Sequence, residues 1–472
     1  MNKSIIILEV DNYLQSFGAS LELPHNIEFG QLATNALMIS KNKIPSENSV
    51  FNWLKEKKYI QNINIINNFI NFDIEYNLNL VYCEKNFMKD SQEKINLEFS
   101  SPNPTGPMHI GHLRGTIIGA VLFNLLKYAG YNINSEMIIN DCGRQVEEFY
   151  KSVLFYKDQE SKLYYEGEYI KDIANEFHYI PTMREVIESQ VNENIKTLNK
   201  LNINHEIITY ESQLYCDSKV LDLLKPYLYI GKIVNQKEEG EMLILRTSAF
   251  GDSQDRVFKN KDYTYFAKDI FYHYDKLQRG FTKQMIVLGE DHIGHLCKLV
   301  PVLKEVFNIE LKVIKVSNVT YKNQKMSKRT GKILTIDEIL PHFDSNLLKI
   351  KMLERTINKP MDINFSEGSN TLFNLYYIMQ YELPKSLNKT LNISCNSITK
   401  RELYRRLLFW PKILKNAVKH MDSHMVYDFL CQIIHFTTNV IQENYNDEII
   451  LTAQKVIQDA CEICQIKYKN NI

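Results

Sequence analysis

Residues 95–139 read INLEFSSPNPTGPMHIGHLRGTIIGAVLFNLLKYAGYNINSEMII, and their pattern is the clearest indication of the fold. Residues 95–99 alternate and predict a short strand, which runs into a loop rich in proline and glycine. From about His112 the apolar residues recur every three or four positions as far as Gly130, which predicts a helix that ends at a glycine. Residues 134–139 predict the next strand. The order strand, loop, helix, strand is typical of the opening of a nucleotide-binding α/β domain.

The α/β pattern returns further along the chain. Residues 285–288 are all apolar and predict a buried strand that ends at Gly289. A helix over 296–307 and a strand over 311–319 are predicted to follow. Residues 150–245 are charged, aromatic and irregular, and are interpreted as an insertion. We therefore predict a doubly wound, Rossmann-like α/β catalytic domain over residues 91–370.

Two smaller domains are predicted on either side of this core. Residues 1–90 predict a small α/β module, with candidate strands at 70–74 and 78–82 and an apolar run at 5–8 that starts a helix or a strand. Residues 371–472 contain long periodic runs with little glycine and predict an all-α helical domain. A chain of 472 residues is long enough for this division into three domains.

Composition excludes several classes of protein. Lys+Arg and Asp+Glu are each 56, so any contact with nucleic acid must come from local basic patches. No apolar run reaches the length of a membrane span, and the N-terminus lacks a signal-peptide cleavage site. The eight cysteines are single except Cys461 and Cys464, which lack the second pair that a zinc ribbon needs. We expect a cytoplasmic protein without a membrane segment or a dedicated metal site.

The loop before the predicted helix carries His109-Ile110-Gly111-His112. Backbone N–H groups and the dipole at a helix start favour a phosphate, and two imidazoles can donate hydrogen bonds to charge that develops on it. Gly111 allows a close approach of the backbone to a base or ribose. The alternative is a proline-rich turn with two surface histidines.

A second motif, Lys325-Met326-Ser327-Lys328, lies in the loop after the strand predicted at 311–319. Two lysines on a loop can follow pyrophosphate as it leaves an α-phosphate, which stabilises the transition state more than the ground state. The alternative is a solvated basic loop. The two motifs in this order favour the first interpretation of each.

Taken together, the two motifs resemble those of the class I aminoacyl-tRNA synthetases, His-Ile-Gly-His and Lys-Met-Ser-Lys, without a substitution. Gly289-Glu290-Asp291 resembles a third ATP-site element at a strand end. The resemblance implies an ATP site built from Pro104, Gly106, His109, Gly111, His112, Gly289, Asp291, Lys325, Met326, Ser327 and Lys328. Of these, it implies catalytic roles for the two histidines and the two lysines.

Further segments resemble the arginyl-tRNA synthetases in particular: 98–103, 139–145, 165–169, 265–269 and 287–292. A guanidinium is a planar cation with five donors, which carboxylates can pair with in a bidentate manner. The resemblance implies an arginine pocket lined by Glu98, Asn103, Tyr265, Asp269 and His292. Glu98 and Asp269 would supply the negative charges, with Asp269 mainly on the guanidinium. The carboxylate that receives the substrate ammonium stays open.

The flanking domains resemble parts of the same family. Residues 29–36 and 69–72 are similar to its N-terminal tRNA-binding module, and residues 376–381 to the start of its anticodon-binding domain. Seven Lys/Arg and one acid lie between 400 and 419, with Tyr404, Phe409 and Trp410 among them. Phosphate contact with stacking on aromatic rings is one use of such a pattern; a solvated amphipathic helix is the other. We expect Arg401, Arg405, Arg406 and Lys412 to contact tRNA.

The resemblance implies a ligase of protein biosynthesis that joins L-arginine to its tRNA through an arginyl-adenylate formed from ATP. Magnesium is expected with ATP, tRNA and arginine are the expected partners, and a monomer is expected. Two alternatives stay open at this point: a catalytically inactive tRNA-binding relative, and a class I synthetase for another amino acid.

Overall fold

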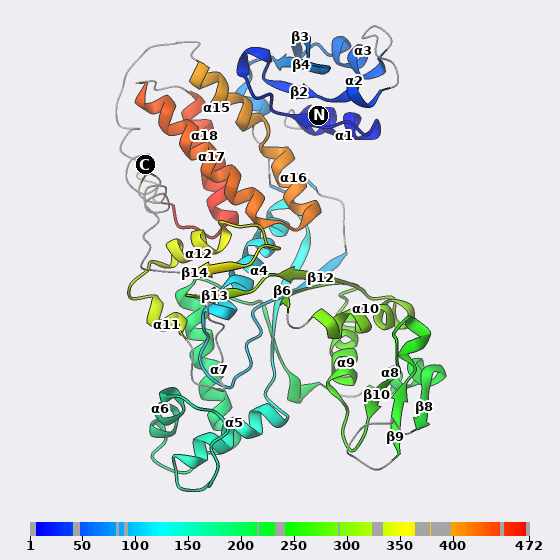
Figure 1. The fold of residues 1–472 in the computed structure, drawn as a ribbon, viewed down its shortest axis with the longest axis vertical. Coiled ribbons are helices and arrows are strands. Elements are labelled where there is room, and N and C mark those ends of the chain that lie inside the picture. The colour runs from blue at the N-terminus through cyan, green and yellow to red at the C-terminus, as the bar shows by residue number, and fades with distance from the viewer. Residues whose placement is uncertain are drawn as a thin grey trace. The chain divides into compact units, whose positions relative to one another are not determined.

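The computed structural model of this chain describes residues 6–40, 48–81, 85–88, 93–214, 217–231, 241–290, 293–322, 334–363, 378, 398–443 and 448–468. The chain divides into two compact units (Figure 1). The first joins Met1–Phe87 to Gly368–Ile472, and the second is Met88–Glu367. The N-terminal module and the C-terminal helices, which lie far apart in the sequence, therefore share one unit.

A parallel five-stranded sheet forms the centre of the second unit. Its strands are β5 (Lys94–Glu98), β6 (Asn132–Ile139), β7 (Ile207–Tyr210), β11 (Lys283–Gly289) and β12 (Glu310–Val316), in the order β12-β11-β5-β6-β7. The chain leaves β5 towards β6 and β7 on one side and later adds β11 and β12 on the other. The predicted Rossmann-like order is thus confirmed, and its switch point lies between β5 and β11, where such sheets bind ligands at the carboxyl ends of their strands.

The helix α4 (Ile110–Ala129) crosses from β5 to β6 and is buried around most of its circumference. It ends as predicted at Gly130, whose φ of 101° is left-handed and whose N–H bonds the carbonyls of Leu126 and Lys127. The helix also lies very close to the end of β5. A Cβ atom at Gly119 would stand 2.4 Å from the side chain of Phe99, so only glycine fits there.

The described part of the segment interpreted as an insertion forms regular helices and strands, although its sequence pattern is irregular. It contains the later part of α5 (Arg144–Phe155) and most of the elements up to β9, and its strand β7 is the edge of the central sheet. The sequence does contain a local helix-start signal in this segment: Thr182 and Glu185 form a capping box at the start of α7. The elements up to β9 are α6 (Glu168–Glu176), α7 (Met183–Lys200), α8 (Ser218–Leu224), β8 (Leu228–Gly231) and β9 (Met242–Leu245).

The remaining elements complete the second unit around the sheet. Strands β8, β9 and β10 form a small antiparallel sheet, and β13 pairs with β14 in parallel. These elements are β10 (Arg256–Lys259), α9 (Tyr265–Gln278), α10 (Ile293–Phe307), β13 (Val319–Tyr321), α11 (Ile336–Ile339), α12 (Ser345–Leu353) and β14 (Met361–Ile363).

The first unit combines a four-stranded antiparallel sheet, in the order β1-β2-β4-β3, with helices from both ends of the chain. The apolar run near the N-terminus begins a helix, α1, and the strand predicted at 70–74 is present as β4. The strand predicted at 78–82 is wrong: Leu78–Leu80 is a 3-10 turn, because the Asn77 side chain accepts the Asn79 N–H and caps it. The elements are α1 (Ile6–Ser16), β1 (Leu21–Glu22), β2 (Leu32–Thr34), α2 (Ala36–Ile39), α3 (Ser49–Glu56), β3 (Ile60–Ile66), β4 (Phe69–Ile74), α15 (Ile398–Leu408), α16 (Trp410–His420), α17 (Ser423–Gln442) and α18 (Glu448–Ile463).

The hydroxyl of Tyr404 joins the two halves of this unit. It accepts the N–H of Asn77 at 2.9 Å and donates to the carbonyl of Glu75 at 2.9 Å. The helical character predicted for the C-terminal region is confirmed for α15 to α18. Among the helices that the structure describes, none is both long and apolar enough to cross a bilayer.

Candidate active site

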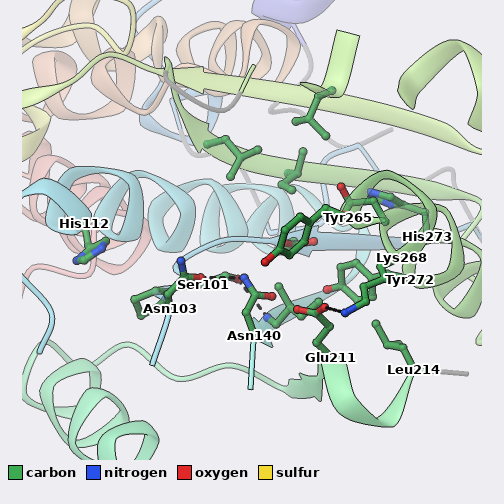
Figure 2. A pocket seen from close by; sticks show the side chains of 17 residues that line it. Ser101, Asn103, His112, Asn140, Glu211, Leu214, Tyr265, Lys268, Tyr272 and His273 are labelled. Atoms are coloured by element: carbon green, nitrogen blue, oxygen red, sulfur yellow. Dashed lines mark hydrogen bonds and ion pairs between the residues drawn. The ribbon is translucent and has the colours of Figure 1, made fainter. Parts of the chain in front are cut away.

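Two adjoining cavities open at the carboxyl ends of β5 and β11. The larger has a volume of about 470 Å³ and the smaller about 280 Å³. Ser101, Pro102, His112 and Leu288 line both cavities. A molecule in one cavity would therefore lie beside a molecule in the other, with His112 at their common wall (Figure 2).

A capping box made of two histidines begins α4 at the wall of the smaller cavity. Nδ1 of His109 accepts the N–H of Gly111 at 3.1 Å, and Nδ1 of His112 accepts the N–H of His109 at 3.2 Å. An imidazole that accepts at Nδ1 carries its proton on Nε2. The backbone thus fixes both rings as Nε2–H donors. The ring centroids are only 3.9 Å apart, at a helix start that favours an anion.

The opposite wall of the smaller cavity comes from the end of β11 and from the segment between β12 and β13. It includes Gly289, Asn318 and Val319. Arg114 fixes that second segment, because its buried guanidinium donates to the carbonyls of Ser317, Arg355, Thr356 and Lys359 at 2.6–3.2 Å. The cavity therefore has two rigid walls, one carrying the histidine donors and one of backbone and small side chains.

The second motif, Lys325 to Lys328, lies outside the described residues, but the segment that follows it, from Leu334 onwards, is bonded to the histidine loop. Ile110 donates its N–H to the carbonyl of Leu334 at 3.1 Å, and Ile336 donates to that of Met108 at 3.0 Å. Thr335 forms an antiparallel bridge with His109. The chain that follows the lysine motif thus pairs directly with the first motif.

The larger cavity is lined from α9 and from the loops after β5 and β6 (Figure 2). Tyr265 and Asp269 lie on the first two turns of α9. Tyr265 is 58% exposed, so the cavity is open to solvent on the side of this residue. Asn103 is held from two sides: its carbonyl accepts from Asn140 at 2.9 Å, and its amide donates to Gln145 at 2.9 Å. Carboxylate, phenol and amide groups therefore converge on one space from three elements.

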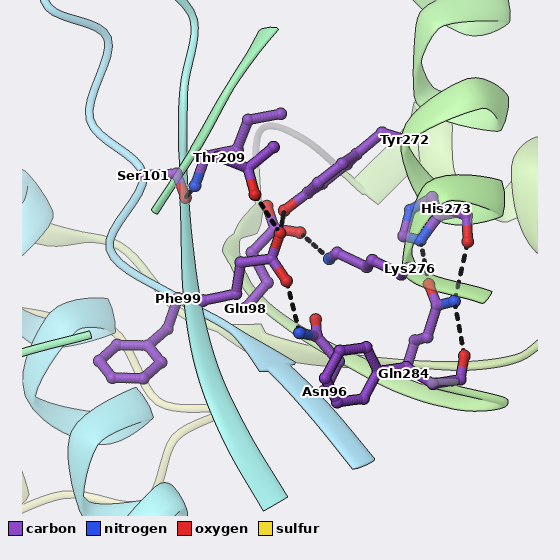
Figure 3. Close-up of polar contacts among 12 residues, drawn as sticks. Asn96, Glu98, Phe99, Ser101, Thr209, Tyr272, His273, Lys276 and Gln284 are labelled. Carbon is purple, nitrogen blue, oxygen red and sulfur yellow. Dashed lines mark hydrogen bonds and ion pairs between the residues drawn. The ribbon is translucent and has the colours of Figure 1, made fainter. Parts of the chain in front are cut away.

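A buried network of charges lies beneath this cavity (Figure 3). Glu98 at the end of β5 forms an ion pair with Lys276 of α9 at 2.6 Å, and the lysine side chain is fully buried. Burial raises the pKa of Glu98, and Lys276 opposes that rise. Burial also acts to raise the pKa of Glu136, but Lys276 and hydrogen bonds from Arg279 and Thr209 outweigh it and hold that pKa below its ordinary value. Each carboxylate thus has a cationic partner.

Comparison with known proteins identifies the family. The chain is 32% identical to the arginine–tRNA ligase of Wolbachia sp. subsp. Brugia malayi (strain TRS) over 394 residues, which covers 73% of this chain and 70% of the relative. The chain belongs to the arginine–tRNA ligase family. A second member, from Ehrlichia ruminantium (strain Gardel), is 30% identical over 90% of this chain and 87% of its own length.

Two further comparisons agree with membership of the arginine–tRNA ligases. The family model described as tRNA synthetases class I (R), catalytic domain, matches residues 78–162. The structure of Thermus thermophilus arginyl-tRNA synthetase superposes with a TM-score of 0.73 and covers all of both chains at 14% identity. The fold is thus shared at low sequence identity.

The structure brings together eight of the ten described residues that the resemblance to arginine–tRNA ligases assigns to the ATP and arginine sites. Glu98, Asn103, Tyr265 and Asp269 line the larger cavity. The smaller is lined by His109, Gly111, His112 and Gly289. Asp291, His292, Lys325, Met326, Ser327 and Lys328 lie outside the described residues.

Pro104 and Gly106 line neither of these two cavities. A Cβ at Gly106 would lie 2.7 Å from the ring of Tyr169, which packs over this loop from α6. The contact with Tyr169 therefore requires glycine at this position, and ATP binding by Pro104 and Gly106 stays a prediction.

Six polar lining residues were missing from the sequence prediction: Ser101, Asn140, Glu211, Lys268, Tyr272 and His273. Ser101, Asn140 and Lys268 lie inside segments that resemble the family, and Tyr272 and His273 follow Asp269 at helical spacing. A signal therefore existed for these five. Glu211 follows β7 and pairs with Lys268 at 2.7 Å. Because β7 falls in the presumed insertion, no sequence signal pointed to that residue.

Two of the four residues expected to contact tRNA are turned into the protein. Arg405 is 2% exposed, pairs in a bidentate manner with Glu402 and donates to the carbonyl of Pro24. Lys412 pairs with Asp11 at 3.0 Å and bonds the carbonyl of Leu21. Both charges are used to fix the N-terminal module, so the expectation is corrected for these residues.

The aromatic rings expected to stack on bases are also buried. Tyr404, Phe409 and Trp410 are 8% exposed or less, and Trp410 stacks on Phe429 inside the helical bundle. Of the predicted tRNA contacts, Arg401 keeps 38% of its side chain exposed, whereas Arg406 lies 4.0 Å over the ring of Phe436. The basic pattern between 400 and 419 is therefore largely one of internal packing.

Proposed function

We propose that the chain attaches L-arginine to its tRNA in two steps, with ATP converted to AMP and pyrophosphate. The main support for this proposal is the pair of adjoining cavities that share His112. Arginine in the larger and ATP in the smaller would place the arginine carboxylate beside the α-phosphate. Holding two reactants in this geometry supplies much of the rate enhancement, because the encounter no longer costs entropy.

ATP is the nucleotide that the class I fold and the two motifs favour. The Nε2–H donors of His109 and His112 would stabilise charge on the phosphates, and Lys325 and Lys328 would reach the leaving pyrophosphate from the other side. Gly289 leaves room for the nucleoside against the end of β11. We propose that magnesium enters bound to the triphosphate, and Asp291 stays a candidate for contact with ATP.

Arginine recognition is proposed to rest on Asp269. Glu98 is already paired with buried Lys276, so its charge is largely balanced within the protein. Asp269 can form the bidentate pair with the guanidinium, and Tyr265 lies beside Asp269. We place Asn103 towards the α-amino and α-carboxyl groups of the substrate. Glu98 and His292 stay candidates for contact with the substrate ammonium.

The reaction needs no covalent enzyme intermediate. A carboxylate oxygen of arginine attacks the α-phosphorus, the bond to pyrophosphate breaks, and arginyl-adenylate forms. The terminal ribose hydroxyl of tRNA then attacks the arginyl carbonyl carbon and AMP leaves. The side chains of the site position the reactants and stabilise charge.

For the macromolecular partner, Arg401 and Arg406 stay our candidates for tRNA contact. We further propose that the protein acts in the cytoplasm as a monomer, which size-exclusion chromatography with light scattering would test by its mass in solution.

The experiment is arginine-dependent charging of tRNA by the purified chain and by Asp269→Asn. The asparagine has nearly the same shape but removes the charge that pairs with the guanidinium. We expect the KM for arginine to rise by about 10- to 100-fold, as for loss of a hydrogen-bonded ion pair worth about 1.5–3 kcal/mol. Asp262→Asn, an exposed loop aspartate just before α9, is the matched control. Unchanged arginine KM in Asp269→Asn would contradict the assignment.

A further inference from the structure

Three residues on successive turns of α9 line the larger cavity: Tyr265, Asp269 and His273. Residues four apart on a helix point the same way, with Cβ atoms about 6 Å apart. The first two belong to the proposed arginine site. His273, which is 2% exposed, is not part of the arginine site proposed above.

Gln284 on β11 fixes the tautomer of His273 (Figure 3). The Gln284 amide nitrogen donates to the carbonyls of His273 at 2.9 Å and Phe281 at 3.0 Å, which determines which end of the amide is oxygen. That oxygen lies 2.6 Å from Nδ1 of His273. An amide oxygen only accepts, so Nδ1 must carry the proton.

His273 lines the larger cavity, and Nε2 is on the edge of the ring opposite the Nδ1 contact with Gln284. Among the described residues, the hydrogen bond of this ring is the one at Nδ1. Burial and the nearby ammonium of Lys276 lower the pKa of His273 to about 3, although the hydrogen bond with Gln284 and the charge of Glu136 act in the other direction. The ring is thus neutral at physiological pH, and a neutral ring protonated at Nδ1 is an acceptor at Nε2.

We propose that Nε2 of His273 accepts an N–H of the substrate guanidinium and is a specificity residue for arginine. The inference rests on the proposed function. A guanidinium has donors on all three nitrogens and no acceptor, so a carboxylate and a fixed acceptor on adjacent helical turns match it. A ureido group of the same shape, as in citrulline, has a carbonyl oxygen in place of one donor. That oxygen would meet Asp269 or His273, each of which can only accept.

A site built to bond a substrate N–H discriminates strongly against an analogue that lacks it, because its buried acceptor is then left without a donor. Loss of one hydrogen bond to a charged group changes affinity by about 10- to 100-fold. His273 should therefore affect the KM for arginine and the rejection of citrulline, and should leave the KM for ATP nearly unchanged.

The test compares His273→Phe and His273→Gln with wild type in tRNA charging. Phenylalanine fills the space without an acceptor, so the KM for arginine should rise about 10- to 100-fold. Glutamine restores an acceptor oxygen and should recover part of that rise. It can also present an NH₂ donor, so citrulline should inhibit His273→Gln more strongly than wild type. His205→Phe is the control, since His205 is a partly buried histidine, bonded to the Phe99 carbonyl at 3.0 Å and outside both cavities.

The outcomes separate this inference from the function on which it rests. If wild type does not charge tRNA with arginine, the proposed function fails. If wild type charges arginine but His273→Phe keeps its arginine KM, or His205→Phe raises that KM as much, the specificity role fails alone. Citrulline inhibition of His273→Gln no stronger than that of wild type also contradicts it. Should His273→Phe not fold, His273→Gln with citrulline still decides.

Discussion

Lys276→Met removes a buried positive charge and keeps an unbranched side chain of similar length. The Lys276 ammonium lies 2.6 Å from Glu98 and 4.1 Å from the ring centroid of Tyr272, and the side chain is fully buried. Removing one partner of such a pair leaves an uncompensated buried charge and costs about 3–5 kcal/mol. At about 2–4 °C per kcal/mol for a unit of this size, the second unit should melt roughly 6–20 °C lower.

The loss should depend on pH in a defined direction. Burial already raises the pKa of Glu98, and without Lys276 this pKa rises further. The folded state of the variant then binds the proton more tightly than the unfolded chain. Its stability therefore falls as pH rises from about 4.3, the ordinary glutamate pKa, to the raised folded value, and the loss is complete above that value. The gap between variant and wild type should be wide at about pH 8 and narrow towards pH 5.

Scanning calorimetry at the two pH values measures both effects. The two tryptophans, Trp53 and Trp410, lie in the first unit, so their fluorescence reports on that unit and serves as an internal reference. Glu98→Gln/Lys276→Met removes both charges and should recover most of the lost stability. A single variant as stable as wild type at pH 8, or a loss equal at both pH values, would refute the reasoning.

Three further predictions follow from single contacts. His112→Ala should lower kcat by about 10²- to 10³-fold, as expected for removal of a transition-state donor, and pre-steady-state adenylate formation would show it; an unchanged rate would exclude that role. Gly119→Ala should cost about 1–3 kcal/mol by calorimetry, because its Cβ meets Phe99 at 2.4 Å; wild-type stability would mean that the helix can shift. Arg405→Met should lower the melting temperature detected by tryptophan fluorescence. It should leave the salt dependence of tRNA binding unchanged, because the Arg405 guanidinium is paired with Glu402. A weaker salt dependence in the variant would show that Arg405 contacts a phosphate.

The parts of the fold that were predicted correctly have local signals. The periodicity from His112 to Gly130 and the apolar run 285–288 each belong to one element, so the sequence shows them directly. The two-histidine motif also lies within four residues. Its capping geometry follows from where the helix begins.

Other features depend on residues that meet only after folding. Glu98 and Lys276 are 178 positions apart, so the sequence shows two charges without showing that they neutralise each other. Arg405 lies 381 positions from the carbonyl of Pro24 that it bonds. A basic helix face looks the same whether its partner is nucleic acid or another segment of the chain, which is why the tRNA contacts were overestimated.

We propose that the paired cavities activate arginine and no other amino acid. This selectivity can be measured by tRNA charging with the purified wild-type chain and each standard amino acid in turn, using tRNA from the same source and ATP. We expect ester formation with arginine alone, together with release of AMP and pyrophosphate. Efficient charging with a different amino acid, or tRNA binding without any turnover, would contradict it.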